Sequence, residues 1–171
     1  MKISAVAASD LRTEVFQVNS AGDLEHRWLD TTRPAAEWTA WRRAPFEPVA
    51  VAVAAISGWA EQIEVFVLDT SGTVWNRWWW HDRGWTPVDR FNPLGAPFGR
   101  SGSRDLSALS AGNGHFNVFV GAEDGRLAVL PHINGPQGPY WHRCDTAERL
   151  GDGWWPAFSP ASTGAYRHPE R

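Results

Sequence analysis

Residues 64–80, EVFVLDTSGTVWNRWWW, form a pattern typical of two β-strands joined by a tight turn. The segment 64–68 is rich in β-branched and aromatic residues, which suit a pleated, half-buried strand. A turn is expected at 69–72, DTSG, because Gly72 accepts the positive φ angle that such turns require. The segment 73–80, crowded with tryptophan, is the expected partner strand. The stretch therefore predicts a β-hairpin.

This hairpin pattern occurs three times along the chain. Each copy has a Val-Phe pair followed by a glycine, and the copies are EVF 14–16 with Gly22, EVF 64–66 with Gly72, and NVF 117–119 with Gly125. The glycine always lies eight positions after the first residue of its group, and the copies begin 50 and 53 positions apart. A period of this size is typical of repeat architectures.

Each repeat divides into four short segments. The first segment is small and apolar, and its copies lie at 4–8, 51–56 and 106–110. The second and third form the hairpin, and the fourth opens with a tryptophan, which is Trp38, Trp85 or Trp141. No segment shows a sustained apolar period of 3.6 residues, which disfavours helix.

Four short strands in a unit of about 50 residues are typical of a β-propeller blade. We therefore predict an all-β chain with three four-stranded blades and the first strand of a fourth. The single propeller segment, 1–171, divides into blades at 3–48, 49–100 and 101–153 and a partial blade at 154–171.

The composition excludes several classes of function. The 171 residues include 16 Lys and Arg against 19 Asp and Glu, which gives a formal net charge of −3. This balance offers no electrostatic basis for binding nucleic acid or an anionic membrane. One cysteine, Cys144, is too few for an internal disulfide or a thiolate zinc site, and we interpret it as a buried structural thiol despite the nearby His142.

The first ten residues, MKISAVAASD, imitate a signal peptide only faintly, because their apolar run is short and ends at Asp10. The segment aligns with the first strands of the other repeats, and we interpret it as a strand. No run approaches the roughly 18 apolar residues of a membrane-spanning helix. We therefore expect a soluble protein and leave its compartment open.

The repeats resemble the tryptophan-rich blades of PLL-like β-propeller lectins. The likeness covers about residues 3–150 and rests on the Val-Phe pair, the turn glycine, a polar-Arg-Trp group and the tryptophan of the fourth segment. The polar-Arg-Trp group reads His-Arg-Trp at 26–28 and Asn-Arg-Trp at 76–78, whereas the third repeat has Val-Leu-Pro at 129–131. The resemblance implies that the chain binds fucose or a related glycan in pockets between adjacent blades.

The residues of these groups are the candidate carbohydrate-binding residues. An indole face offers apolar contact to a sugar ring, and arginine offers a fixed fork of donors to hydroxyl groups. The candidates are His26, Arg27, Trp28, Trp38, Asn76, Arg77, Trp78, Trp85 and Trp141. In the alternative interpretation, most of these tryptophans pack blade against blade, and the two arginines pair with carboxylates.

Strand geometry limits how these residues combine. Side chains alternate between the two faces of a strand, so Asn76, Trp78 and Trp80 share one face while Trp75, Arg77 and Trp79 share the other. Both faces cannot serve one pocket. In the third repeat we expect Pro131 to interrupt the ladder of a central strand, so that the pocket there is missing or altered.

We expect no catalytic residue, no metal site and no cofactor. Glu14, Glu64 and Asp69 recur in similar places, which favours exposed edge charges over the one special constellation that catalysis needs. The six histidines show no short spacing typical of metal ligands. Two other functions stay open, a glycoside hydrolase or lyase propeller and a module for protein interaction or oligomerisation.

Closure sets a further expectation. Propellers close with typically 4–8 blades, and closure protects the edges of their sheets. Three blades and one strand do not close alone. We therefore expect a homo-oligomer assembled head to tail, or a piece of a longer propeller.

Overall fold

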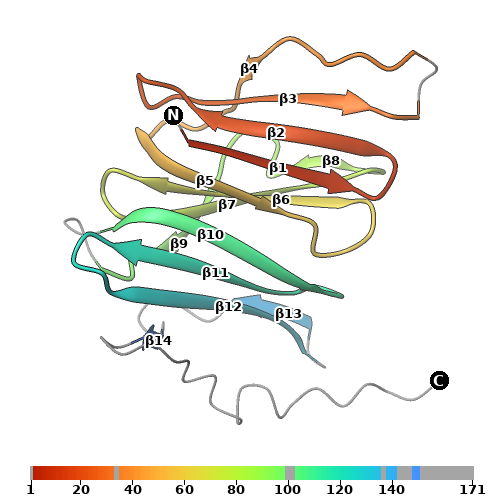
Figure 1. The fold of residues 1–171 in the computed structure, drawn as a ribbon. Helices are drawn as coiled ribbons and strands as arrows, with labels where there is room; N and C mark the ends of the chain where they lie inside the picture. Colours follow the sequence, from red (N-terminus) through yellow and green to blue (C-terminus); the bar gives the residue numbers. More distant parts are fainter. Residues whose placement is uncertain (1, 33–34, 99–102, 136–137, 142–147, 151–171) are drawn as a thin grey trace.

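The computed structural model describes residues 2–32, 35–98, 103–135, 138–141 and 148–150. Over these residues the chain forms strands joined by turns and contains no helix (Figure 1). Every strand pairing is antiparallel, within three sheets. The prediction of an all-β chain is confirmed. None of the described residues belongs to a helix long and apolar enough to cross a membrane.

The first sheet has four strands in sequence order. They are β1 (Lys2–Ala8), β2 (Arg12–Val18), β3 (Leu24–Asp30) and β4 (Arg42–Arg43). The turn between β2 and β3 contains Gly22 at a φ of 82°, the left-handed conformation that the hairpin pattern predicts. Across this hairpin Phe16 lies opposite His26.

The second sheet contains the hairpin from which the repeat was recognised. Its strands are β5 (Ala50–Ile56), β6 (Gln62–Asp69), β7 (Val74–Trp80), β8 (Gly84–Thr86) and β9 (Asn92–Gly95). In this hairpin Phe66 lies opposite Asn76, 50 positions after the equivalent pair of the first sheet. The register therefore repeats together with the sequence.

The third sheet repeats the same order. Its strands are β10 (Ser103–Gly112), β11 (His115–Ala122), β12 (Leu127–Gly135), β13 (Gly138–Trp141) and β14 (Glu148–Leu150). Phe119 lies opposite Val129, at the place that Phe16 and Phe66 hold in the other hairpins. Val129 thus occupies the position of His26 and Asn76, as the alignment of the repeats predicts.

The outer edge of each sheet is divided, which differs from the expected single fourth strand. In the second sheet β8 pairs with one half of β7, and β9 pairs with the other half. In the third sheet β13 and β14 likewise pair with the two halves of β12. In the first sheet the two pieces are a single bridge at Trp38 and the strand β4. The second and third sheets therefore have five strands rather than four.

The tryptophans that open the fourth segment hold equivalent places. They pair across the sheets as Leu29 with Trp38, Trp79 with Trp85, and His132 with Trp141. These three pairs lie at the same step of the repeat. Each indole therefore lies on the outer edge of its sheet, at the same step of the repeat.

The three sheets lie one above the other, with the second in the middle (Figure 1). The first strands make the main contacts between them, because β5 contacts both β1 and β10. Small residues such as Ala52 and Ala54 on β5 allow this close approach. One apolar core lies between the first two sheets and a second core between the last two. As a result every residue of β6 is buried.

The expectation that Pro131 interrupts the ladder of a central strand holds only on the outer side of β12, and the ladder between β11 and β12 continues through it. Strand β12 runs through it, and Pro131 pairs with Asn117 of β11. On its other side β12 pairs with β14 over 127–129 and with β13 over 132–135, so Pro131 lies at the break between them. A proline is tolerated there because its missing N–H is not needed for a ladder bond.

Several expectations concern residues outside those that the structure describes. These are the buried thiol at Cys144, its neighbour His142, the start of the chain at Met1, and the partial fourth blade at 154–171.

Gly114 provides a stability test of the packing between the second and third sheets. Its φ is 75°, and a Cβ atom there would lie 2.0 Å from Cζ2 of Trp59. Gly125 has a similar φ of 84° with nothing within 4 Å of such an atom. We expect Gly114→Ala to destabilise the fold by about 2 kcal/mol more than Gly125→Ala, because only the first adds overpacking to backbone strain.

Chemical denaturation of the two variants measures this difference. Equal losses of unfolding free energy would contradict the packing of Trp59 against Gly114.

Candidate functional site

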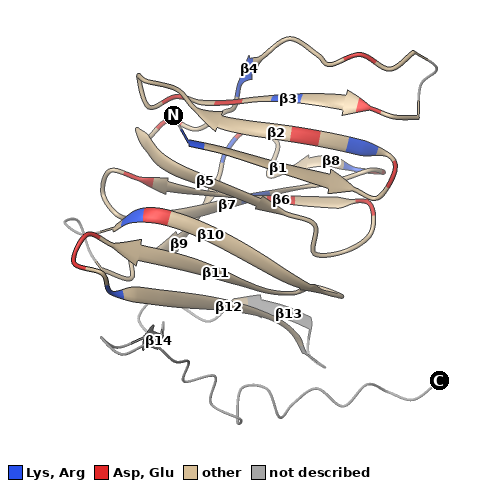
Figure 2. Cartoon of the chain, in the orientation of Figure 1, with Lys and Arg blue, Asp and Glu red and all other residues tan. Residues whose placement is uncertain are grey.

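A polar cluster lies on the face of the first sheet that packs against the second. It consists of Arg12, Glu14 and His26, and it is called the first cluster below. Nε of Arg12 donates to Oε2 of Glu14 over 2.7 Å, and Nδ1 of His26 lies 2.5 Å from Oε1 of the same carboxyl group. Glu14 is completely buried, and the Arg12 side chain keeps 14% of its surface exposed. Figure 2 shows a basic and an acidic position close together on β2.

Aromatic rings from both sheets surround the first cluster. The Arg12 guanidinium lies over two indoles, 4.5 Å from the ring centre of Trp28 and 4.7 Å from that of Trp79. Trp85 of the second sheet meets the His26 ring edge to face at 6.1 Å. A charged donor between indole faces, beside a buried carboxylate, offers both hydrogen bonds and apolar contact to a ligand.

The second sheet repeats this cluster one period later. Gln62, Glu64 and Asn76, called the second cluster below, occupy the positions of Arg12, Glu14 and His26 and face the third sheet. Nε2 of Gln62 donates to Glu64 over 3.1 Å, and Nδ2 of Asn76 donates over 2.7 Å. The hydrogen-bond pattern is therefore the same, but a neutral amide replaces the arginine.

Burial changes the ionisation of Glu64, the acid of the second cluster. Burial raises the pKa of the Glu64 carboxyl group to about 7, and the hydrogen bonds from Asn76 and Gln62 oppose this shift. No guanidinium belongs to this cluster to balance the charge. The side-chain amide oxygen of Asn76, Oδ1, is buried and has no hydrogen-bond partner among the described residues. Rotation of that amide would present an acceptor to a protonated Glu64.

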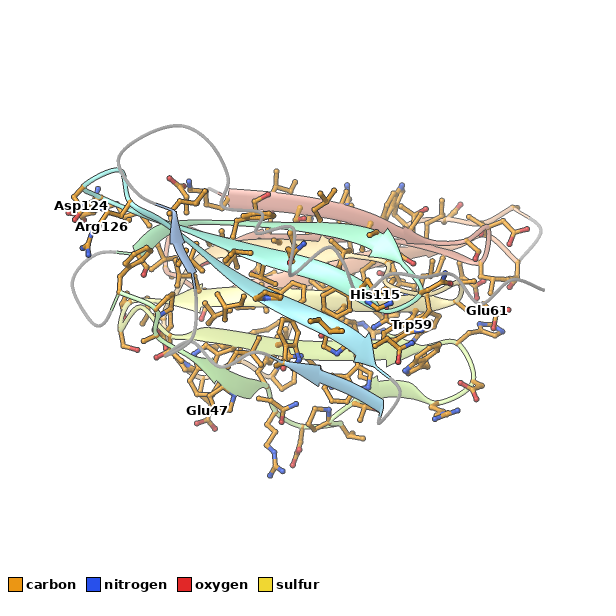
Figure 3. All side chains as sticks on the ribbon, turned by 90° about the horizontal axis from the view of Figure 1, so that it is seen from below. Glu47, Trp59, Glu61, His115, Asp124 and Arg126 are labelled. Atoms are coloured by element: carbon orange, nitrogen blue, oxygen red, sulfur yellow. The ribbon has the colours of Figure 1, made fainter. Side chains whose placement is uncertain are left out.

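Several aromatic rings pack together at the interface that contains the second cluster. His132 stacks on Phe116 with ring centres 4.2 Å apart, and Trp141 and Trp59 meet the His132 ring edge to face. Figure 3 shows Trp59 and His115 close to each other at one end of the molecule. Gln62, Glu64 and Asn76 are all less than 5% exposed. The second cluster is thus less accessible than the first.

Two of the predicted binding residues lie on the opposite face of the first sheet. The guanidinium of Arg27 is 5.0 Å from the ring centre of Trp38 and 4.9 Å from that of Trp41, and its Nε is buried with no hydrogen-bond partner in the part of the chain that the structure describes. Strand alternation separates Arg27 and Trp38 from His26 and Trp28. The structure therefore does not bring the whole His-Arg-Trp group to one place.

Arg77 supports the end of the second sheet nearest the first cluster. It donates to the carbonyl oxygens of Pro87 and Val88, and its guanidinium lies 4.9 Å from the ring centre of Trp85. Burial lowers the pKa of Arg77, and the nearby negative charge of Glu14 opposes this shift. Arg77 therefore faces the first sheet and holds the outer edge of its own sheet.

Trp78 and Trp141 belong to the other interface. Trp78 pairs with Glu64 in the register of β6 and β7 and is half-buried, whereas Trp141 packs 5.6 Å from Phe66. The nine predicted residues are thus divided between three faces. Of these, His26, Trp28, Arg77 and Trp85 gather between the first and second sheets.

The interpretation of the three acids as exposed edge charges is wrong. Glu14, Glu64 and Asp69 are 0%, 4% and 4% exposed. Asp69 accepts hydrogen bonds from the backbone N–H groups of Ser71 and Thr73 and from Nε1 of Trp75, so it stabilises the turn. Glu14 and Glu64 become buried because residues about 50 positions away cover them.

Sequence reasoning missed Arg12 and Gln62. Each lies two positions before the acid of its cluster, and residues two apart on a strand share a face. This shared spacing was the available signal. No group of three or more His, Cys, Asp or Glu side chains within the described residues could hold a metal ion.

Antiparallel sheets stacked through small first strands, with polar and aromatic clusters between them, are arranged as in a segment of a β-propeller. Solved structures that are similar to this chain include lectins. The BP39L lectin of Burkholderia pseudomallei is 22% identical to the chain with a TM-score of 0.61, covering 86% of this chain and 41% of that lectin. The resemblance to propeller lectins is thereby confirmed at the level of the fold.

Two further lectins share the fold. SapL1 in complex with α-methyl fucoside is 17% identical with a TM-score of 0.55, over 82% of this chain and 45% of SapL1. A mutant of Aleuria aurantia lectin bound to Fucα1-6GlcNAc is 17% identical with a TM-score of 0.53, over 90% of this chain and 47% of that lectin. The chain spans less than half the length of these structures. No protein-family model and no curated protein sequence matches it.

Proposed function

We propose that the chain is a carbohydrate-binding, lectin-like propeller segment that holds a fucose-type glycan, without chemistry, at the first cluster. The observation that carries this proposal is the Arg12 guanidinium, which is bonded to the buried Glu14 and lies over Trp28 and Trp79. Fucosides bound to SapL1 and to the Aleuria lectin support the sugar class.

The chemistry of the cluster suits a sugar. Sugar hydroxyl groups accept hydrogen bonds, and the partly exposed guanidinium of Arg12 has further N–H donors besides the Nε that is bonded to Glu14. The apolar face of a pyranose ring packs against an indole, and Trp28 is a half-buried indole at the first cluster, with the guanidinium groups of Arg12 and Arg42 also over its ring. The first cluster is favoured over the second because Arg12 is partly exposed, whereas the second cluster is covered.

The enzyme alternative is less well supported. Glycoside hydrolysis generally uses two carboxyl groups on either side of the scissile bond. The first cluster as defined contains one, Glu14, and its role in the structure is to pair with Arg12 and His26. The lectin fold of the structural neighbours also favours binding without catalysis.

The substitution Arg12→Gln tests the proposal, because it installs the residue type that the second cluster already has at the equivalent position. We expect the variant to bind α-methyl fucoside about 10- to 100-fold more weakly, since a charged donor to a sugar hydroxyl is lost. The introduced glutamine can keep the hydrogen bond to Glu14, as Gln62 does to Glu64. Isothermal titration calorimetry measures the affinity.

A thermal melt and a matched variant complete the experiment. Arg27→Gln removes an arginine on the opposite face and is expected to bind the fucoside as the wild-type chain does. Equal affinity for wild type and Arg12→Gln, with both folded, would place the sugar elsewhere. A wild-type chain that binds no monosaccharide or glycan would instead support the interaction-module alternative.

A further inference from the structure

Within the part of the chain that the structure describes, the first and third sheets each have one face against which no other sheet packs. Strand β6 of the middle sheet is buried on both faces, whereas β2 and β11 alternate between buried and half-buried residues. Because side chains alternate along a strand, the half-buried residues lie on the faces turned away from the middle sheet. These are called the open faces of the first and third sheets below.

On the open face of the first sheet, Ile3 occupies a position at which the other two sheets have packed apolar residues. It lies opposite Gln17, and the equivalent residues are Val53 in the second sheet and Leu106 in the third. Val53 is 5% exposed within the first core, and Leu106 packs against the second core. Ile3, by contrast, is 58% exposed.

On the open face of the third sheet, Leu109 likewise occupies a position at which the other two sheets have packed apolar residues. It lies opposite Asn117, and its equivalents are Val6 and Ile56. Ile56 is 7% exposed, and Val6 packs against the first core, so both face the next sheet. Leu109 itself is 62% exposed.

A repeated pair of aromatic residues joins neighbouring sheets. Phe16 meets Trp85 edge to face at 6.0 Å, and Phe66 meets Trp141 in the same way at 5.6 Å. Phe119 on the third sheet is equivalent to the two phenylalanines of these pairs. Trp38 on the first sheet is equivalent to the two tryptophans. Phe119 is half-buried and Trp38 is 40% exposed, so the two halves of a third pair lie on the two open faces.

We propose that the open face of the first sheet docks on the open face of the third sheet of a second copy of this chain. The contact repeats the packing that joins neighbouring sheets within one chain. Ile3 and Trp38 of one copy meet Leu109 and Phe119 of the other. The second copy is favoured as the occupant because the two open faces are the two halves of an interface already formed twice within the chain. Exposed large apolar residues gathered on such faces indicate an interaction surface.

This arrangement is head to tail, because two different faces meet. Contacts of this kind form closed rings when the rotation between copies closes, and open chains otherwise. Two copies would contribute six sheets, within the range of roughly 4–8 blades in which propellers close. At the proposed contact between the two copies, Asn117 occupies the position that Glu14 and Glu64 hold in the other two sheets. The contact therefore adds no further acidic cluster.

Light scattering of wild-type protein and of two single variants tests the proposal. Ile3→Asp places a charge on one open face and Leu109→Asp on the other, and neither residue belongs to a core. We expect wild type to have at least twice the mass of one chain and each variant to have the mass of a single chain. Val88→Asp is the matched control, because Val88 is 79% exposed at the loop that Arg77 holds and lies on no strand.

Mixing the variants tests the direction of assembly. Ile3→Asp keeps the open face of the third sheet and Leu109→Asp keeps that of the first, so an equal mixture should form a one-to-one pair with twice the mass of one chain. A monomeric wild type, variants that assemble like wild type, or a mixture that stays monomeric would overturn the proposal. Both variants should bind α-methyl fucoside like wild type, which separates this test from that of sugar binding.

Discussion

Replacement of Phe66 by alanine is expected to lower the free energy of unfolding by about 3–5 kcal/mol. Phe66 is completely buried in the central strand of the middle sheet. Its ring lies 6.0 Å from that of Phe116 and 5.6 Å from that of Trp141, both of the third sheet. The variant would therefore leave a cavity in the core between these sheets, which the closely packed rings cannot fill.

The equivalent phenylalanine of the third sheet provides the matched control. Phe119→Ala removes the same atoms from a half-buried position on an open face. In dilute protein we expect it to cost about 1 kcal/mol, because less surface returns to water. Urea unfolding followed by circular dichroism measures both losses. Equal losses at the two positions would contradict the placement of the middle sheet between the other two.

The stability of the fold is expected to fall as pH rises through neutrality because of Glu64. Its pKa is raised to about 7 in the folded chain from an ordinary value of 4.5. The folded state therefore holds the proton more tightly than the unfolded state. The contribution of Glu64 to the free energy of unfolding is fully present below its pKa in the unfolded chain. It is lost as pH rises through its pKa in the folded chain.

The size of this effect follows from the shift of the pKa. One pKa unit corresponds to about 1.4 kcal/mol, so the full contribution of Glu64 is about 3 kcal/mol. Between about pH 5.5 and about pH 8, we expect the free energy of unfolding to fall by about 2 kcal/mol. Urea unfolding at a series of pH values across this window measures the slope.

The variant Glu64→Gln isolates the responsible group. Glutamine carries no titratable proton, so the fall between pH values should largely disappear in this variant. Glu47→Gln is the matched control, because Glu47 is an exposed acid (Figure 3) and its replacement should leave the slope unchanged. Parallel curves for wild type and Glu64→Gln would show that Glu64 is not the source.

The hairpins, the repeat and the equivalence of the three outer tryptophans could all be predicted from the sequence. Strand preference depends on β-branched and aromatic side chains, and turns such as the one at Gly22 depend on local backbone freedom. These properties involve residues within a few positions of each other. For the same reason the alignment placed Val129 correctly at the position of His26 and Asn76.

The composition of the candidate site depended on the tertiary structure. Alternation predicted that Arg77 and Trp78 lie on opposite faces, but it could not show which neighbouring sheet each face meets. The structure brings Arg12 rather than Arg27 to Glu14, and it places Trp79 of the next sheet over that arginine.

Burial of the acids was likewise decided by long-range packing. Glu14 and Glu64 occupy the same position of the repeat, and the sequence around each of them does not show that the carboxyl group is buried. Arg12 accompanies the first acid and a neutral glutamine the second, while the sheets that cover them come from elsewhere in the chain. Burial is a property of contacts between residues distant in sequence, so only the stacked sheets determine it.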